Sequence, residues 1–188
     1  MNKQEFLEIL EEHGKLGFQE QIDYGKFCLY SIITHSTAIE GSTMSEVENQ
    51  LLFDEGITAK GKNIIEQNMN LDLKDAYEQS MELAKEHTPF SVDMLKQLSS
   101  IVMRRTGTTY NTLGGTFDSS KGDLRLVNVT AGQGGKSYMN YLKVPQKLKE
   151  FCGEMNERRE HLLKNPDVYG QYCLSFDAHL KLVTIIHG

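Results

Sequence analysis

Two side chains that could take part in chemistry lie one helical turn apart in the first third of the chain. Ser36 offers a hydroxyl and Glu40 a carboxylate, and residues four apart lie on the same side of a helix. Glu40 continues a stripe that contains Leu29 and Ile33, which predicts that its carboxylate points toward the core. There it would need a cationic or hydrogen-bonding partner, or it would stay protonated. The alternative is a frayed last turn that leaves Glu40 in water before Gly41 ends the helix.

A second group of residues has the types that bind phosphate. Arg104 and Arg105 end a predicted helix, where cations suit either an anion or the negative end of the helix dipole, and the dipole is the favoured explanation. Seven of the 16 glycines lie between residues 106 and 136. They could cradle a phosphate, but neither G-x-x-x-x-G-K-[ST] nor G-x-G-x-x-G occurs, which favours a flexible surface hairpin.

The elements that must position these residues are predicted to be helices. Hydrophobic spacing predicts a short helix over residues 3–13 and a longer one over residues 19–40. Ser45 and Glu48 form a capping-box pattern for a helix that reaches Phe53. The same spacing predicts further helices over residues 62–69, 72–85, 91–105, 145–155 and 166–186.

One segment has the pattern of a strand. Residues 123–130 alternate polar and apolar side chains, which predicts a short strand or one arm of a hairpin. The sequence therefore predicts a mostly α fold in a single domain over residues 1–188, with one inserted β-hairpin and no internal repeat.

Composition restricts the classes of function. The chain has 188 residues, 39% hydrophobic and 24% charged, as in soluble globular domains. A net charge of −6 argues against nucleic acid as a partner. Cys28, Cys152 and Cys173 lack metal-ligand spacing, so we expect no metal site but reduced thiols and a cytoplasmic location. No signal peptide and no apolar run of about 20 residues is present, so no membrane partner is expected.

The last helix is unusually apolar. Asn165, Pro166 and Asp167 provide the chemistry of a helix start. The residues that follow, up to Ile186, are apolar on nearly every face, which predicts a buried central helix.

Four segments in this order resemble Fic-domain proteins, a family of AMP transferases. THSTAIEGSTMS (34–45) matches the family's inhibitory motif, Ser or Thr, three residues, Glu, then Gly or Asn, at Ser36, Glu40 and Gly41. The other segments are the helical region through Ala76, GGTFDSSKGDLRLVNV in the place of the family's flap hairpin, and FDAHLKLVTI, which resembles the helix before the catalytic loop. The resemblance runs from about residue 20 and implies an inhibitory-helix region over 19–56 and an incomplete Fic core over 57–188.

The end of the chain departs from the family. The family's motif reads His-Pro-Phe or another aromatic, any residue, Asp or Glu, Gly-Asn-Gly, Arg. Here Ile186 stands in the histidine's place and His187 comes one residue late. We therefore expect a chain truncated at the catalytic loop. A one-base deletion in codons for Ile-His-Pro-Trp would give the observed Ile-Ile-His-Gly, and a divergent end or an artificial boundary are the alternatives.

The resemblance implies roles for several residues. His187, as a degenerate counterpart, would be the general base toward a Ser, Thr or Tyr hydroxyl of a target protein. ATP and Mg²⁺ are the cofactors of the intact family, and we expect that this chain binds neither of them productively. Glu40 would keep the γ-phosphate from seating. The flap residues Leu124, Arg125, Leu126 and Val127 would hold the target segment by strand pairing.

Two functions follow from the sequence. The first is a self-inhibited protein AMP transferase whose present chain is inactive. The second is a non-catalytic binding or regulatory module that associates with an intact partner. A helical DNA-binding regulator is disfavoured by the acidic charge. An apolar terminal helix without its usual cover also predicts a homo-oligomer.

Overall fold

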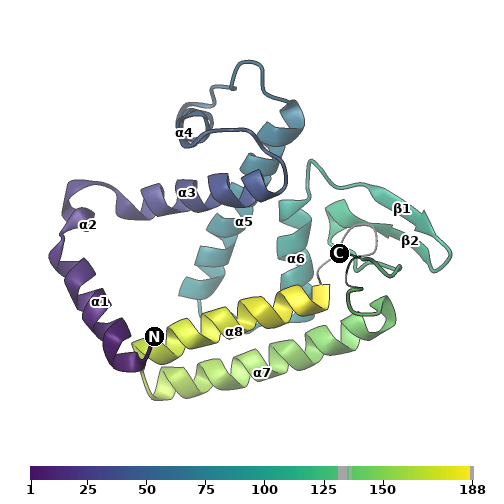
Figure 1. The fold of residues 1–188 in the computed structure, drawn as a ribbon. Helices are drawn as coiled ribbons and strands as arrows, with labels where there is room; N and C mark the ends of the chain where they lie inside the picture. Colours follow the sequence, from purple (N-terminus) through teal and green to yellow (C-terminus); the bar gives the residue numbers. More distant parts are fainter. Residues whose placement is uncertain (131–134, 136, 187–188) are drawn as a thin grey trace.

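The structure is a computed structural model that describes residues 1–130, 135 and 137–186. These residues form a mostly helical fold with one small antiparallel hairpin, which confirms the predicted fold class (Figure 1). The helices are α1 (Lys3–Lys15), α2 (Phe18–Gln21), α3 (Tyr24–Ile39), α4 (Glu46–Glu55), α5 (Ile64–Lys85), α6 (Val92–Val102), α7 (Val144–Lys164) and α8 (Val168–Ile186). The strands are β1 (Thr109–Thr112) and β2 (Gly115–Asp118).

The hydrophobic core lies where α7 and α8 run side by side (Figure 1). Pro145 lies in the first turn of α7, where its missing N–H leaves no donor unpaired. The apolar residues of α7 then recur every three or four positions and form the buried core together with Ile185 of α8. Its members on α7 are Val144, Leu148, Phe151, Cys152 and Met155.

The first helix packs against the start of α8. Phe6 is buried and meets two rings of α8 edge-on, with centroid distances of 5.4 Å to Tyr169 and 4.8 Å to Tyr172. Such edge-to-face pairs stabilise beyond the area that they bury. An ion pair of 3.0 Å between Lys3 and Asp167 lies beside them. The beginning of the chain is therefore joined to its last helix.

The opposite layer consists of α3 and α4 on one end of α5, which also packs along α6 (Figure 1). Ile33 of α3 is fully buried in this layer. Asn63 and Glu66 form a capping box at the start of α5. Helix α5 is thus the element that carries both α3 and α6.

The hairpin β1–β2 projects beyond α6, and its base is docked on that helix. Tyr110 pairs with Phe117 in the antiparallel register, and their rings stack at 4.9 Å. The chain then turns at Gly122, whose φ is +71°. A Cβ at this position would lie 2.0 Å from the carbonyl oxygen of Lys96, so only glycine fits.

Two predicted helix boundaries are wrong. The helix expected over residues 19–40 is interrupted because Ile22 is extended and Asp23 caps the N–H of Lys26, which starts α3. The separate helices expected over 62–69 and 72–85 are one helix, α5. The intervening Asn70 and Leu71 contain no helix breaker, and the amide of Asn70 is bonded inside the fold.

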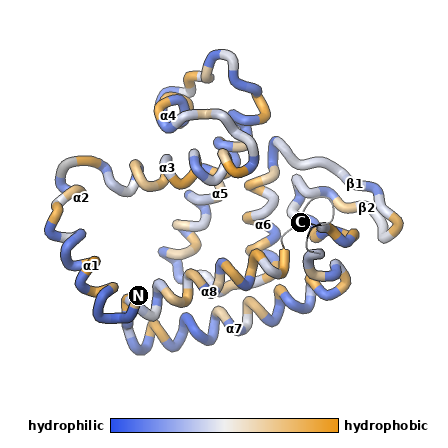
Figure 2. The backbone as a smooth tube through the Cα atoms, viewed as in Figure 1, coloured by the Kyte–Doolittle hydropathy of each residue, from blue (hydrophilic) through white to orange (hydrophobic). Residues whose placement is uncertain are grey.

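Helix α8 is not buried all round, contrary to the prediction. Ile185 is its only buried residue among those that the structure describes. Four apolar residues of α8, spaced four positions apart, are exposed. The hydropathy colouring of Figure 2 marks the hydrophobic residues along this helix. These exposed residues are Val168 (47%), Tyr172 (47%), Phe176 (68%) and Leu180 (63%).

Within the part of the chain that the structure covers, no helix combines the length and the apolar character that a membrane crossing requires.

Candidate functional site

The Ser36–Glu40–Gly41 pattern lies at the end of α3, where the chain turns sharply. Gly41 has a φ of +94°, a left-handed conformation that side chains with a Cβ avoid. The N–H of Ser42 donates to the carbonyl oxygen of Thr37 at 3.0 Å, and that of Gly41 donates to Ala38 at 3.1 Å. These bonds satisfy carbonyl groups that the end of a helix leaves free. The predicted glycine cap is confirmed.

Glu40 points into solvent, so the expectation of an inward carboxylate is wrong. Ile33 on the same stripe is buried, Ser36 is half-buried, and Glu40 is exposed. Glu40 is the C-cap residue, with a ψ of 8°, and it already lies outside the regular helix. The alternative of a last turn in water is therefore the one observed, and the carboxylate is accessible.

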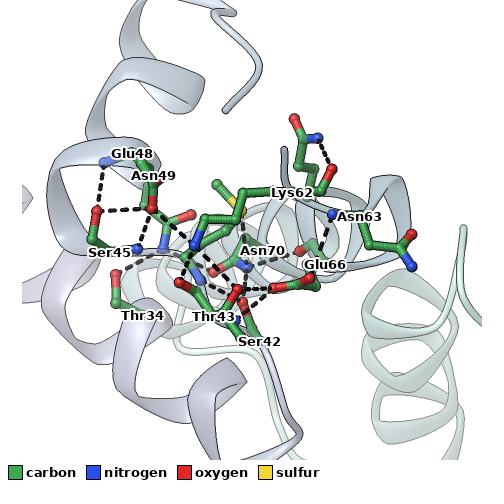
Figure 3. A network of polar contacts seen from close by, with 12 residues as sticks. Thr34, Ser42, Thr43, Ser45, Glu48, Asn49, Lys62, Asn63, Glu66 and Asn70 are labelled. Atoms are coloured by element: carbon green, nitrogen blue, oxygen red, sulfur yellow. Dashed lines mark hydrogen bonds and ion pairs between the residues drawn. The ribbon is translucent and has the colours of Figure 1, made fainter. Parts of the chain in front are cut away.

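A buried polar network holds this turn from behind, and Asn70 of α5 is its centre (Figure 3). Its Oδ1 accepts from the hydroxyl of Thr37 at 2.8 Å and from Nδ2 of Asn49 at 3.0 Å. Its Nδ2 donates to Oγ of Ser42 at 3.1 Å and to the carbonyl oxygen of Glu66 at 2.8 Å. Both lone pairs and both hydrogens of this fully buried amide are thus used.

An outer shell of charged residues fixes the loop that follows the turn. Glu66 accepts from the N–H of Thr43 at 2.6 Å and from its hydroxyl at 2.9 Å. Lys62 donates to the carbonyl oxygen of Thr43 and lies 3.6 Å from Glu48. The N–H of Thr43 holds the pKa of Glu66 below its ordinary value, and that of Ser45 does the same for Glu48.

Arg104 and Arg105 are both engaged with carboxylates of α5. The buried carboxylate of Asp72 forms an ion pair with the guanidinium of Arg105 and accepts its backbone N–H at 2.7 Å. Arg104 lies 2.8 Å from Asp75. The two arginines therefore join the end of α6 to α5, and they do not form a free phosphate site.

The predicted flap residues Leu124, Arg125, Leu126 and Val127 do not form a strand. The paired strands lie earlier, in β1 and β2. Of the predicted arm 123–130, the part that pairs is its end, where the N–H of Tyr138 donates to Val129 at 3.1 Å and Thr130 bridges to Ser137. Side-chain bonds to the backbone replace the ladder: Asp123 accepts the N–H of Asp118 at 3.0 Å, and Arg125 donates to two carbonyl groups.

The predicted catalytic residue, His187, lies outside the described residues. Within residues 1–130, 135 and 137–186, no group of three His, Cys, Asp or Glu side chains is placed to hold a metal ion. Arg104 and Arg105, the residues considered for a phosphate, are paired with Asp75 and Asp72.

Sequence reasoning missed Asn70, Asn49 and Thr37. Asn70 lies between two predicted helices, so no helical face is assigned to it. Asn49 lies in a predicted helix with many polar residues, in which its burial gives no distinct pattern. A signal was nevertheless present at Thr37, which lies four residues after the buried Ile33 and so faces the same neighbour. A polar residue at a core position indicates a bonded partner.

The comparisons with known proteins support the fold. No protein-family model matches the chain, and no curated protein matches it either. A solved structure, a Fic-domain-containing signalling protein from Bacteroides thetaiotaomicron, superimposes with a TM-score of 0.61 at 14% sequence identity. The match takes in 74% of this chain and 50% of that protein, so the chain spans about half the length of the structure that it resembles. The fold is therefore Fic-like.

We predict that Asn70→Ala destabilises the fold by about 2–4 kcal/mol, because several buried groups lose their partner at once. Asn68→Ala is the matched control, since Asn68 lies on the same helix and is only half-buried. Its cost should stay below about 1 kcal/mol. Urea unfolding of both variants at pH 7 measures the difference, and equal losses would contradict the central role of Asn70.

We further predict a pH-dependent contribution from Glu66. Its pKa is lowered in the fold, so its stabilisation is complete above the ordinary value of 4.5 and is lost as the pH falls through the folded pKa. Glu66→Gln should therefore be less stable than the original chain at pH 7. The difference in free energy of unfolding between the two proteins should decrease below pH 4.5. Urea melts of both proteins at a series of pH values test this. A difference that stays constant down to pH 3, about one unit below the value for a free glutamate, would count against it.

Proposed function

We propose that this chain is a self-inhibited protein of the Fic type, built to regulate AMP transfer from ATP to a hydroxyl of a target protein, and that the present chain does not transfer AMP itself. The observation that carries the proposal is the Ser36–Glu40–Gly41 pattern on a braced turn, in a fold that resembles a Fic-domain protein.

The exposure of Glu40 supports an inhibitory role. A carboxylate that competes with a nucleotide phosphate must be available to a cation outside its own helix. Glu40 meets this requirement because it is exposed, and its backbone is fixed by the Ser42–Thr37 bond and by Asn70 behind it. A fixed backbone reduces the conformational freedom that Glu40 would lose when its carboxylate pairs.

The inactivity of the chain follows from what AMP transfer requires. ATP and Mg²⁺ supply the transferred group and neutralise its charge, and positioning together with electrostatic stabilisation provides most of the rate. At the 104–105 pair both arginines are engaged with Asp75 and Asp72, and so they are not free for the phosphates of ATP. Segment 124–130 would still place a target chain beside the fold by backbone pairing.

We predict no transfer of labelled AMP by the 188-residue chain. The assay uses ATP labelled at the α-phosphate with the original chain, Glu40→Gly and His187→Ala. None of the three should label itself or an added target protein. Label with Glu40→Gly alone would overturn the inactivity but support the inhibitory glutamate. Label with the original chain above that of His187→Ala would contradict both.

The inhibitory role has its own test in trans. An active Fic-type transferase whose inhibitory glutamate has been removed is mixed with this chain. The original chain should lower its rate, and Glu40→Gln should not, because the amide cannot form an ion pair. Equal inhibition by both would remove Glu40 from the proposal.

The outer face of α8 favours a second function, that of a non-catalytic module that assembles with a second copy of itself. Its exposed residues Tyr172, Phe176 and Leu180 are spaced four apart and form one row. The charges that border this row are neutralised within the chain, because Arg158 pairs with Asp177 at 2.8 Å and Lys181 pairs with Glu154. These two ion pairs reduce the charge that two approaching copies would face at this row.

This row can form a contact between two copies of the chain that are related by a two-fold axis. Antiparallel pairing about Phe176 would set Tyr172 of one copy against Leu180 of the other, so the same patch serves both sides. Exposed apolar rows of this kind drive association in water.

We predict that the chain is a homodimer at micromolar concentration and that Phe176→Glu shifts it to a monomer. Ile65→Glu is the control, because Ile65 is similarly exposed (54%) but lies on α5, and it should leave the mass unchanged. Light scattering coupled to gel filtration measures the mass. A monomeric original chain, or a dimer that survives Phe176→Glu, would remove α8 as the contact.

A further inference from the structure

The side chain of Arg125, one of the predicted target-binding residues of the flap, is turned toward its own chain. Nη1 donates to the carbonyl oxygen of Val127 at 2.8 Å, and Nη2 donates to that of Met139 at 2.6 Å. The base of the flap is taken here as the described residues 124–130 and 137–141. Val127 precedes the paired residues of this base and Met139 follows them. The planar guanidinium therefore bridges the two ends of the segment.

Further bonds join the two sides of this base among residues 124–130 and 137–141. The N–H of Tyr138 donates to Val129, and the N–H of Tyr141 donates to Oδ1 of Asn128 at 3.1 Å. Thr130 and Ser137 form an isolated bridge. An isolated two-stranded hairpin is marginal in water, so contacts outside the strand pairing contribute to its stability.

The tip of the β1–β2 hairpin supports the same base from the other side. A Cβ built at Gly114 would lie 2.8 Å from the carbonyl oxygen of Leu126 and 3.4 Å from the hydroxyl of Tyr141. The turn of the hairpin is thus packed directly on the residue that follows Arg125. The β1–β2 hairpin therefore packs against the flap base, and the hydrogen bonds of Arg125 join the two sides of that base.

We propose that Arg125 is a positioning residue that fixes the base of the flap, with the turn at Gly114 as its brace. It does not bind the target itself. What the flap would hold rests on the proposed function, but the arrangement of the flap does not. A segment whose base is held in place costs a binding partner less ordering than a loose loop would.

The chemistry of the guanidinium explains why arginine occupies this position. Its donors have a fixed fork geometry that can reach two carbonyl groups at once, whereas the ammonium of lysine is a single point. The half-buried position also lowers the pKa of Arg125 through burial, as expected for a cation whose partners are backbone dipoles.

The chain contains a matched control. Arg159 on α7 is also half-buried and donates to two backbone carbonyl groups, Thr88 at 2.6 Å and His87 at 2.9 Å. It ties the loop before α6, in which the N–H of Phe90 donates to Asn156 at 2.7 Å. Loss of either arginine removes two hydrogen bonds to backbone carbonyl groups. For Arg125 these bonds lie at the flap base, and for Arg159 they lie in the loop before α6.

The test is amide hydrogen exchange of the free chain, followed residue by residue, in Arg125→Lys, Arg125→Ala and Arg159→Lys. Arg125→Lys should speed exchange at Tyr138 and Tyr141 by about tenfold, the size expected for one lost charge-assisted bond. Arg125→Ala should have a larger effect, and both should leave Phe90 unchanged. Arg159→Lys should do the reverse. Gly114→Ala should speed exchange at Tyr138 with Arg125 intact.

Equal acceleration at Tyr138 and Phe90 in the Arg125 variants would show a general loss of stability and overturn the proposal, as would no change at Tyr138. The measurement needs neither nucleotide nor target, so its outcome is independent of the AMP-transfer assays. If exchange changes as expected and those assays contradict the proposed function, Arg125 still positions the hairpin.

Discussion

The carboxamide of Asn70 is the interaction on which the region around Glu40 depends. An amide taken out of water is costly unless each of its donors and acceptors finds a partner. Here the partners come from the end of α3, the loop after it, α4 and the backbone of α5 itself. No one of these segments can shift without leaving a buried polar group unpaired. The motif of interest is therefore carried by α5, and α5 in turn is held to α6 by the buried carboxylate of Asp72.

The parts of this arrangement that the sequence predicts are those governed by local rules. The capping box of Ser45 and Glu48 and the left-handed cap at Gly41 depend on residues within a few positions of each other, and both are present. The mostly helical class, with one hairpin, also follows from spacing alone. In contrast, the sequence leaves the exposure of Glu40 open, because continuing the stripe of Ile33 assumes a regular helix up to its last turn, and a frayed turn places the carboxylate in water.

The parts that were missed depend on contacts between distant segments. A polar residue such as Asn70 looks like a surface residue until α3 and α4 are placed against it. The alternation around Arg125 resembles a strand, but its guanidinium bonds to a carbonyl group 14 positions away at Met139, and the backbone bends instead. The apolar row of α8 was read as buried because periodicity reports which face is apolar, and it does not report whether anything covers that face.

The close approach of Gly122 to α6 has a consequence for how this sequence can change over evolutionary time. A side chain at this position would overlap the carbonyl oxygen of Lys96, and the left-handed backbone adds a second obstacle. Substitution of Gly122 is therefore strongly disfavoured. In contrast, Leu113 at the tip of the β1–β2 hairpin is fully exposed, so its substitution is tolerated. Homologues that share this fold should be invariant at the glycine and diverse at the tip, so that lineages could acquire new surface specificity there without remodelling the scaffold.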